Sequence, residues 1–157
     1  FIHRALSFTN SKYNNTIPEP KEYDKDDQEL IELIQESKSK VRENIENNQI
    51  DRAMKNILDL SDGCNRYFQK KEPWKGDSDN TIYLSVNAVY SIAIMLHPFM
   101  PHSMDMLFRS INIEKNNINW KNCSELNIIS GHKINKPEIL FEKIEDKEMD
   151  EQKKKLK

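Results

Sequence analysis

Apolar side chains recur every three or four positions along most of the chain, which is the spacing of an amphipathic helix. Five segments carry such a stripe: residues 1–13, about 24–46, 50–71, 79–96 and a short stretch after Pro101. Either Asp24 or Asp26 can cap the second helix, and Asp79 is the expected cap of the fourth. No stretch alternates between apolar and polar residues for long enough to indicate a strand. The pattern therefore predicts an all-α bundle of about five helices.

The third and fourth helices have the strongest apolar patterns. On the third helix, the side chains expected to point inward are Ala53, Met54, Ile57, Leu58, Cys64 and Phe68. The fourth helix is apolar nearly all round, which is typical of a helix at the centre of a bundle. The residues predicted to be almost fully buried are Ile57, Cys64, Phe68, Val86, Val89, Ile92 and Phe108.

Prolines and charge runs mark the segments outside the helices. Prolines predict an extended connector over residues 14–25. Pro98 and Pro101 forbid a continuous helix between the fourth and fifth helical segments. The end of the chain mixes acids and lysines evenly, which is typical of a solvated helix or a linker. We therefore expect a helical domain over residues 1–144 and a charged helical tail or linker over residues 145–157.

The size and charge of the chain limit the kind of partner that it can bind. A chain of 157 residues has room for one domain with a real hydrophobic core. Its net charge of -2 argues against bulk electrostatic capture of nucleic acid. Seven acids and two lysines give residues 19–32 a charge of -5, which leaves +3 for the remainder. Any nucleic-acid contact is therefore expected to be local.

The chain has no pattern of a membrane or secreted protein. Its longest apolar run, around residues 82–100, is interrupted by polar side chains and suits a buried helix. Cys64 and Cys123 are far apart, which favours a reducing, intracellular setting over a disulfide framework or a zinc site. No signal peptide is visible, and a helical pattern starts directly at Phe1, so we expect the chain to be cut from a longer protein.

No catalytic motif emerges from the sequence. His97 and His102 are separated by two prolines and cannot share a helical face, so a metal site is not expected. A nucleophile elbow of the Gly-x-Ser-x-Gly type and a glycine-rich phosphate loop are both missing. Four methionines gather at the proline bend: Met95, Met100, Met104 and Met106. We interpret these methionines first as side chains that fill an irregular core. The alternative is that they form a hydrophobic groove for a partner.

The stretch CNRYFQKKEPWKGDSDN, residues 64–80, is the most informative part of the chain. Trp74 follows Pro73, which must end the third helix, and four cations surround it: Arg66, Lys70, Lys71 and Lys75. An isolated tryptophan is usually a core anchor, but the apolar stripe of the third helix does not continue to Trp74. Aromatic rings beside cations also hold unstacked bases of nucleic-acid loops. The cations themselves equally suit an ordinary solvated helix end.

The order of motifs resembles a known family. CNRYFQKKEPW is followed by an apolar helix that ends in LHPFMPHSMDMLF, and then by GHKINKPEILFEKIE. Together with the opening FIHRALSFTNSKY and TIPEP, these motifs resemble the anticodon-binding domain of methionyl-tRNA synthetases over essentially the whole chain. The resemblance implies an all-α helical bundle of the class Ia aminoacyl-tRNA synthetase type.

The resemblance also implies a function and its residues. A domain of this family reads the CAU anticodon of methionine tRNA, and the tryptophan at the position of Trp74 stacks against an anticodon base. The two polar readers of bacterial members fall on Ser7 and Ser11 here, and Lys12 or Asn10 are possible substitutes for them. The expected anticodon-binding residues are Trp74, Asn65, Arg66, Lys70, Lys71, Lys75, Ser7, Ser11 and Lys12.

The catalytic signatures of the family, of the His-Ile-Gly-His and Lys-Met-Ser-Lys-Ser types, do not occur in the sequence. The resemblance therefore implies that ATP and methionine bind to a catalytic domain of a parent methionine–tRNA ligase, and that this chain holds no cofactor. The expected partners are methionine tRNA and that catalytic domain, with no membrane, in a cytoplasmic or organellar enzyme. The alternative is a helical protein-interaction module that docks through the methionine-rich bend and the charged tail.

Overall fold

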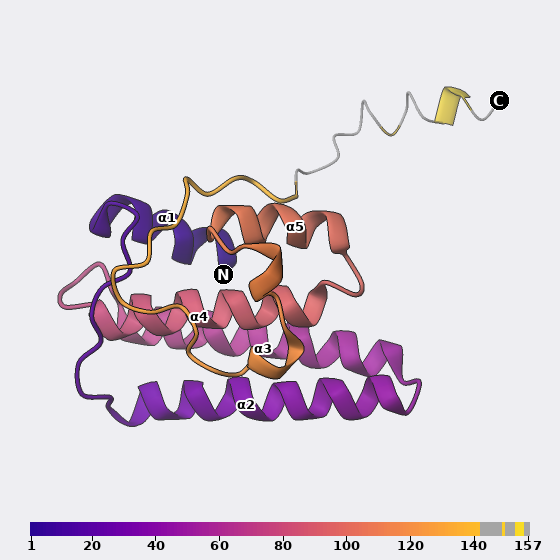
Figure 1. Cartoon of the computed structure of the whole chain (residues 1–157), viewed down its shortest axis with the longest axis horizontal. Coiled ribbons are helices and arrows are strands. Elements are labelled where there is room, and N and C mark those ends of the chain that lie inside the picture. Colours follow the sequence, from indigo (N-terminus) through magenta and orange to yellow (C-terminus); the bar gives the residue numbers. More distant parts are fainter. Residues whose placement is uncertain (142–148, 150–152, 156–157) are drawn as a thin grey trace.

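Five α-helices make up the computed structural model, which describes residues 1–141, 149 and 153–155 (Figure 1). They are α1 (Ile2–Tyr13), α2 (Lys25–Glu46), α3 (Ile50–Lys71), α4 (Asp79–Leu96) and α5 (Pro101–Ser110). Two short 3-10 helices, η1 (Lys115–Asn117) and η2 (Trp120–Asn122), follow α5. These residues contain no strand beyond one isolated bridge between Thr16 and Lys133. The predicted all-α bundle is confirmed. The expected tail lies mostly outside the described residues.

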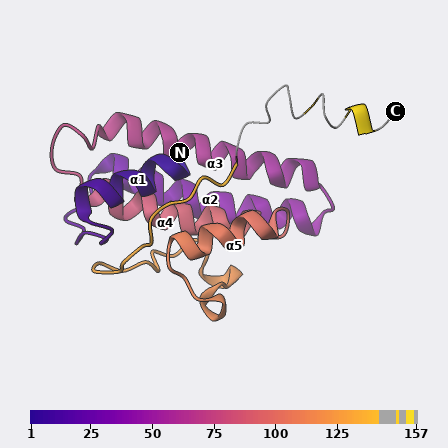
Figure 2. The ribbon, with the colours of Figure 1, turned by 90° about the horizontal axis from the view of Figure 1, so that it is seen from above.

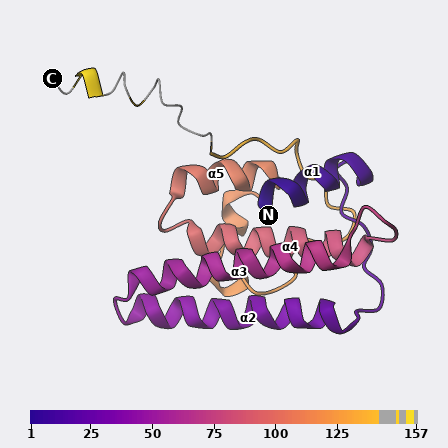
Figure 3. The same cartoon turned by 180° about the vertical axis from the view of Figure 1, so that it is seen from behind.

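Helix α4 forms the centre of the bundle. It packs against each of α1, α2, α3 and α5. Helices α1 and α5 lie on one side of α4 and the α2–α3 hairpin on the other (Figures 1 and 3). The segment after α5, with both 3-10 helices, lies on the opposite side of the bundle from α3 (Figure 2). Every residue from 81 to 96 is buried, as expected for a helix that is apolar nearly all round.

The burial predictions hold with one exception. All seven residues expected to be almost fully buried are at most 2% exposed. Leu58 was expected to point inward and is 56% exposed, which corrects that prediction. Ile57 and Leu60 occupy the inward positions on either side of it, and the helical turn directs Leu58 to solvent. Met95 and Met104 are fully buried, which confirms core filling for these two methionines.

The helix ends follow from local side-chain chemistry. Asp24 caps α2: its carboxylate accepts from the backbone N–H of Asp27, and the Asp27 carboxylate accepts from the backbone N–H of Asp24. The expected Asp79 cap of α4 is wrong, because Ser78 occupies the cap position. The Asp79 carboxylate instead accepts from the Tyr13 hydroxyl and pairs with Lys21.

The extended connector before α2 is held by the segment near residue 132. The backbone N–H of Ile17 donates to the His132 carbonyl at 2.8 Å, and the N–H of Gly131 donates to the Ile17 carbonyl at 2.8 Å. Gly131 has a φ of +79°, which only glycine adopts at little cost. These bonds fix the start of the connector and therefore the end of α1. None of the described helices is long and apolar enough to cross a membrane.

Candidate nucleic-acid interface

Trp74 lies in the short loop between α3 and α4, and its side chain is 47% exposed. Helix α3 ends because Glu72 adopts the left-handed conformation, with a φ of 43°, and Pro73 cannot extend a helix. The backbone N–H of Lys75 then donates to the Glu72 carbonyl at 2.8 Å and closes a tight turn. Of the two interpretations of Trp74, a fully buried core anchor is therefore excluded.

An aromatic cluster supports the inner side of the Trp74 ring. The fully buried Phe68 ring lies 6.5 Å from it, centroid to centroid, at an interplanar angle of 47°. Phe8 and Phe1 pack edge-on against Phe68 at 6.0 and 6.4 Å. The indole is thus anchored on the core while part of it stays open to solvent. That combination suits a platform for a flat ligand.

Polar side chains of α1 and α3 lie beside the aromatic cluster that supports the Trp74 ring. The Arg4 guanidinium lies 4.9 Å above the Phe68 ring and donates to Asn65 Oδ1 at 2.8 Å and to Gln69 Oε1 at 3.4 Å. Ser7 and Ser11 follow Arg4 at helical spacing on α1, so the three lie on one face. We use the name Trp74 surface for the ring and its polar border, which consist of Arg4, Ser7, Ser11, Lys12, Asn65, Gln69 and Trp74.

Residues near the end of α1 fasten the Trp74 loop. The Lys12 ammonium donates to the carbonyl oxygens of Pro73 at 3.0 Å and Gly76 at 2.6 Å. The Tyr13 hydroxyl bonds Ser78 Oγ at 2.7 Å and the Asp79 carboxylate at 2.8 Å. Burial is the main cause that raises the pKa of Tyr13 to about 12. The other suggested substitute reader, Asn10, donates to Asn15 Oδ1 at 2.6 Å and holds the end of α1.

The lysines around Trp74 are engaged with acids of the same chain. Lys70 lies 2.6 Å from Asp26, and Lys75 lies 2.9 Å from Glu72. Lys71 pairs with Asp24 at 2.6 Å and with Asp27 at 2.7 Å, and its side chain is only 16% exposed. Much of the positive charge apparent in the sequence is therefore balanced within the fold.

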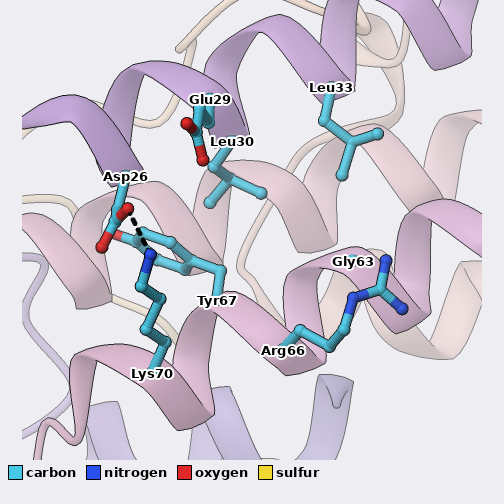
Figure 4. Close-up of a pocket in the computed structure, with 8 residues that line it drawn as sticks. All are labelled: Asp26, Glu29, Leu30, Leu33, Gly63, Arg66, Tyr67 and Lys70. Atoms are coloured by element: carbon cyan, nitrogen blue, oxygen red, sulfur yellow. Dashed lines mark hydrogen bonds and ion pairs between the residues drawn. The ribbon is translucent and has the colours of Figure 1, made fainter.

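Arg66 and Lys70 lie on the side of α3 that faces α2. They line a hollow of about 200 Å³ between these two helices, with Leu30 and Leu33 opposite (Figure 4). The complete lining is Asp26, Glu29, Leu30, Leu33, Gly63, Arg66, Tyr67 and Lys70. Arg66 forms no ion pair within residues 1–141.

The fold thus separates most of the expected anticodon-binding residues into two groups. Ser7, Ser11, Lys12, Asn65 and Trp74 belong to the Trp74 surface, and Arg66, Lys70 and Lys71 face α2. The ninth expected residue, Lys75, belongs to neither group and pairs with Glu72 in the loop.

Two residues of the Trp74 surface were absent from the sequence-based set. Arg4 and Gln69 join this surface because α1 lies beside the second half of α3. The position of Arg4 one helical turn before Ser7 was the available signal on α1. No sequence signal pointed to Gln69, because its place on this surface depends on a hydrogen bond from Arg4, 65 positions away in the chain.

Comparison with known proteins places the chain in a family. The family model described as the anticodon binding domain of methionyl tRNA ligase matches residues 17–157. The methionine–tRNA ligase of Pyrococcus abyssi is 34% identical over 152 residues, which are 93% of this chain and 20% of that protein. The ligase of Nanoarchaeum equitans is 35% identical over 150 residues, which are 96% of this chain and 18% of that protein. The chain thus spans about a fifth of these relatives.

The same fold occurs in a solved structure. The apo form of Mycobacterium tuberculosis methionyl-tRNA synthetase superimposes with a TM-score of 0.84 at 19% identity, over 92% of this chain and 31% of that protein. That likeness extends to the all-α architecture and the order of the helices. The family match covers most of the chain and includes the Trp74 loop. The chain belongs to the family of anticodon-binding domains of methionyl tRNA ligases.

Proposed function

We propose that this chain recognises the CAU anticodon of methionine tRNA on the Trp74 surface. The observation that carries the proposal is the position of Trp74, a ring anchored on Phe68 and 47% exposed beside a polar border. Anticodon loops present unstacked bases, and such bases bind proteins by stacking on aromatic rings and by hydrogen bonds along their edges. In this proposal one anticodon base stacks on Trp74.

The polar border supplies groups that can read base edges. Ser7, Ser11 and Asn65 carry hydroxyl and amide groups that donate and accept hydrogen bonds. Arg4 donates to the side-chain oxygens of both Asn65 and Gln69, so it restrains the two amides. Arg66, which faces α2, is the cation that this proposal assigns to the RNA backbone, because Lys70 and Lys75 are paired with Asp26 and Glu72. The two carboxylates beside Lys71 give that lysine a structural role in the proposal.

We further propose that the chain is the tRNA-anchoring part of a methionine–tRNA ligase whose ATP and methionine sites lie outside residues 1–157. The support is that relatives bearing this name are about five times longer than the matched region. On this proposal the chain itself performs no chemical step. It contributes affinity and selection of the tRNA, which the rest of the enzyme then aminoacylates.

A binding experiment tests the anticodon proposal. A methionine tRNA transcript and the same transcript with the anticodon changed from CAU to GAU are titrated against the chain. A preference of about tenfold or more for CAU, equal to about 1.4 kcal/mol, is expected. Equal affinities would contradict the proposal. Such a result would favour the protein-interaction alternative, which the burial of Met95 and Met104 otherwise weakens.

A further inference from the structure

The loop that carries Trp74 has few restraints of its own. Its internal backbone bond runs from the Lys75 N–H to the Glu72 carbonyl, before the chain reaches Gly76. A Cβ atom placed on Gly76 would meet nothing within 4 Å, so the backbone there is open to solvent. Stacking costs less when the ring is held in its bound orientation beforehand. The restraint on this ring must therefore come from outside the loop.

Lys12 provides such a restraint from the last turn of α1. Its ammonium bonds the carbonyl oxygens of Pro73 at 3.0 Å and Gly76 at 2.6 Å. One of these carbonyls directly precedes Trp74 in the chain and the other follows it by two positions, so a single ammonium bridges the loop on both sides of the ring. The ammonium also lies 5.6 Å from the Phe8 ring centroid and 5.9 Å from that of Tyr13.

The same geometry disfavours direct RNA binding by Lys12. A lysine ammonium has three N–H donors, and the carbonyls of Pro73 and Gly76 occupy two of them. The rings of Phe8 and Tyr13 flank the cation and stabilise it where it lies. A phosphate would have to replace bonds that hold the loop together. The ammonium is thus placed to act on the loop backbone.

We propose that Lys12 is a positioning residue that clamps the Trp74 loop so that the ring is held ready for base stacking. This inference rests on the proposed function, because it assigns to Lys12 an effect on RNA binding that passes through Trp74. It distinguishes Lys12 from the other cations of this region. Lys70 and Lys75 pair with carboxylates, whereas Lys12 bonds backbone carbonyls.

The first test observes the ring without RNA. The chain has two tryptophans, so the experiment uses a Trp120→Phe background in which Trp74 is the remaining fluorophore. Lys12→Met keeps the aliphatic stem and removes the donors, and it should lower Trp74 anisotropy and increase acrylamide quenching. Lys12→Arg should retain the wild-type values. The matched charge control is Lys40→Met, since Lys40 pairs with Glu36 on α2, and it should change neither signal.

The second test is a double-mutant cycle in tRNA affinity. Lys12→Met should weaken binding about fivefold or more when Trp74 is present and less than about twofold in a Trp74→Ala background. The dependence of affinity on salt should be unchanged. Equal losses in both backgrounds, with a salt slope reduced by about 0.7, would show that Lys12 contacts a phosphate directly and would overturn the proposal.

The two tests separate the clamp from the proposed function. Unchanged Trp74 fluorescence in Lys12→Met overturns the clamp even if the wild-type chain binds tRNA well. Altered fluorescence together with no tRNA binding by the wild-type chain supports the clamp on the loop but refutes its role in base stacking. Circular dichroism of each variant confirms that the helices are intact before either result is read.

Discussion

The Tyr67 hydroxyl on α3 donates a hydrogen bond to Asp27 on α2 at 2.8 Å, where the Asp27 side chain is 1% exposed. Asp27 also accepts from Asn80 at 2.8 Å and pairs with Lys71 at 2.7 Å. Burial, followed by the bond to Asp27, raises the pKa of Tyr67 far above its ordinary value. One buried carboxylate thus joins α2 to the end of α3 and the start of α4, which stand on either side of the loop that carries Trp74.

Removal of the Tyr67 hydroxyl should destabilise the fold. Tyr67→Phe leaves the buried Asp27 carboxylate with one donor fewer, and the expected loss is about 1–3 kcal/mol of unfolding free energy. Urea denaturation with an unchanged m-value measures it. Tyr23→Phe is the control, since the half-buried Tyr23 hydroxyl has no hydrogen-bond partner in the described part of the chain. Equal losses for both variants would show that the bond to Asp27 contributes little.

Gly63 allows α2 to approach α3 closely. A Cβ atom at Gly63 would clash with Leu33 Cδ2, so Gly63→Ala requires the Leu33 side chain to move. Because Leu33 is half-buried and lines the hollow, it can partly move aside, and we expect a cost of about 1 kcal/mol in the wild-type background. In a Leu33→Ala background the same change should stabilise by about 0.5–1 kcal/mol, because alanine favours helix over glycine. Urea midpoints measure both effects: Gly63→Ala should lower the midpoint in the wild-type background and raise it in the Leu33→Ala background. The same change in both backgrounds would contradict the prediction.

The Asp24 cap should make the stability of the fold depend on pH in the acidic range. A hydrogen bond from Lys71, and then one from the Asp27 N–H, lower the pKa of Asp24 below its ordinary value. A lowered folded-state pKa stabilises the fold above the unfolded pKa of about 3.9, and this contribution is lost as pH falls through the folded pKa. Asp24→Asn keeps a capping oxygen without the charge. The urea midpoints of wild type and Asp24→Asn should therefore converge between about pH 6 and pH 2.5. A constant gap would refute this.

Trp74→Ala should separate binding from stability. The ring is half exposed, so we expect a loss of at most about 1.5 kcal/mol of stability, against about 3–5 kcal/mol for a buried tryptophan. Loss of one stacking contact should weaken tRNA binding about 5- to 150-fold. Thermal melting and titration of the folded protein measure the two effects. Trp74→Phe should retain much of the affinity. A large drop in melting temperature with unchanged affinity would identify Trp74 as a core residue.

Binding should depend only weakly on salt. The chain has a net charge of -2, and Lys70, Lys71 and Lys75 already pair with carboxylates. We expect about 2–4 phosphate contacts and a correspondingly shallow slope of log affinity against log salt, about 0.7 per contact for single strands. Titrations at several salt concentrations measure the slope. A steep slope would indicate an interface dominated by cations outside the Trp74 surface.

The helices and several of their ends were predictable from the sequence because local chemistry sets them, although the cap of α4 is Ser78 and not Asp79. Asp24 caps α2 with the N–H of Asp27, three positions away, and Pro73 stops α3 by its own ring. The central place of α4 follows from its apolar surface alone. For Trp74 the sequence left a core anchor and an exposed ring as alternatives, and the end of the apolar stripe before it was the signal for exposure.

The partners of the charged and polar side chains depend on contacts between distant parts of the chain. Lys12 reaches a carbonyl 64 positions away, and Lys70 is balanced by an acid 44 positions away. A lysine beside a tryptophan looks the same in sequence whether it meets a phosphate, a carboxylate or a carbonyl oxygen. Only the packing of α1 and α2 against α3 decides which of these groups comes within hydrogen-bond distance. The sequence therefore determines the helices and the end of the apolar stripe before Trp74, and the tertiary structure determines which rings support Trp74 and which group each cation meets.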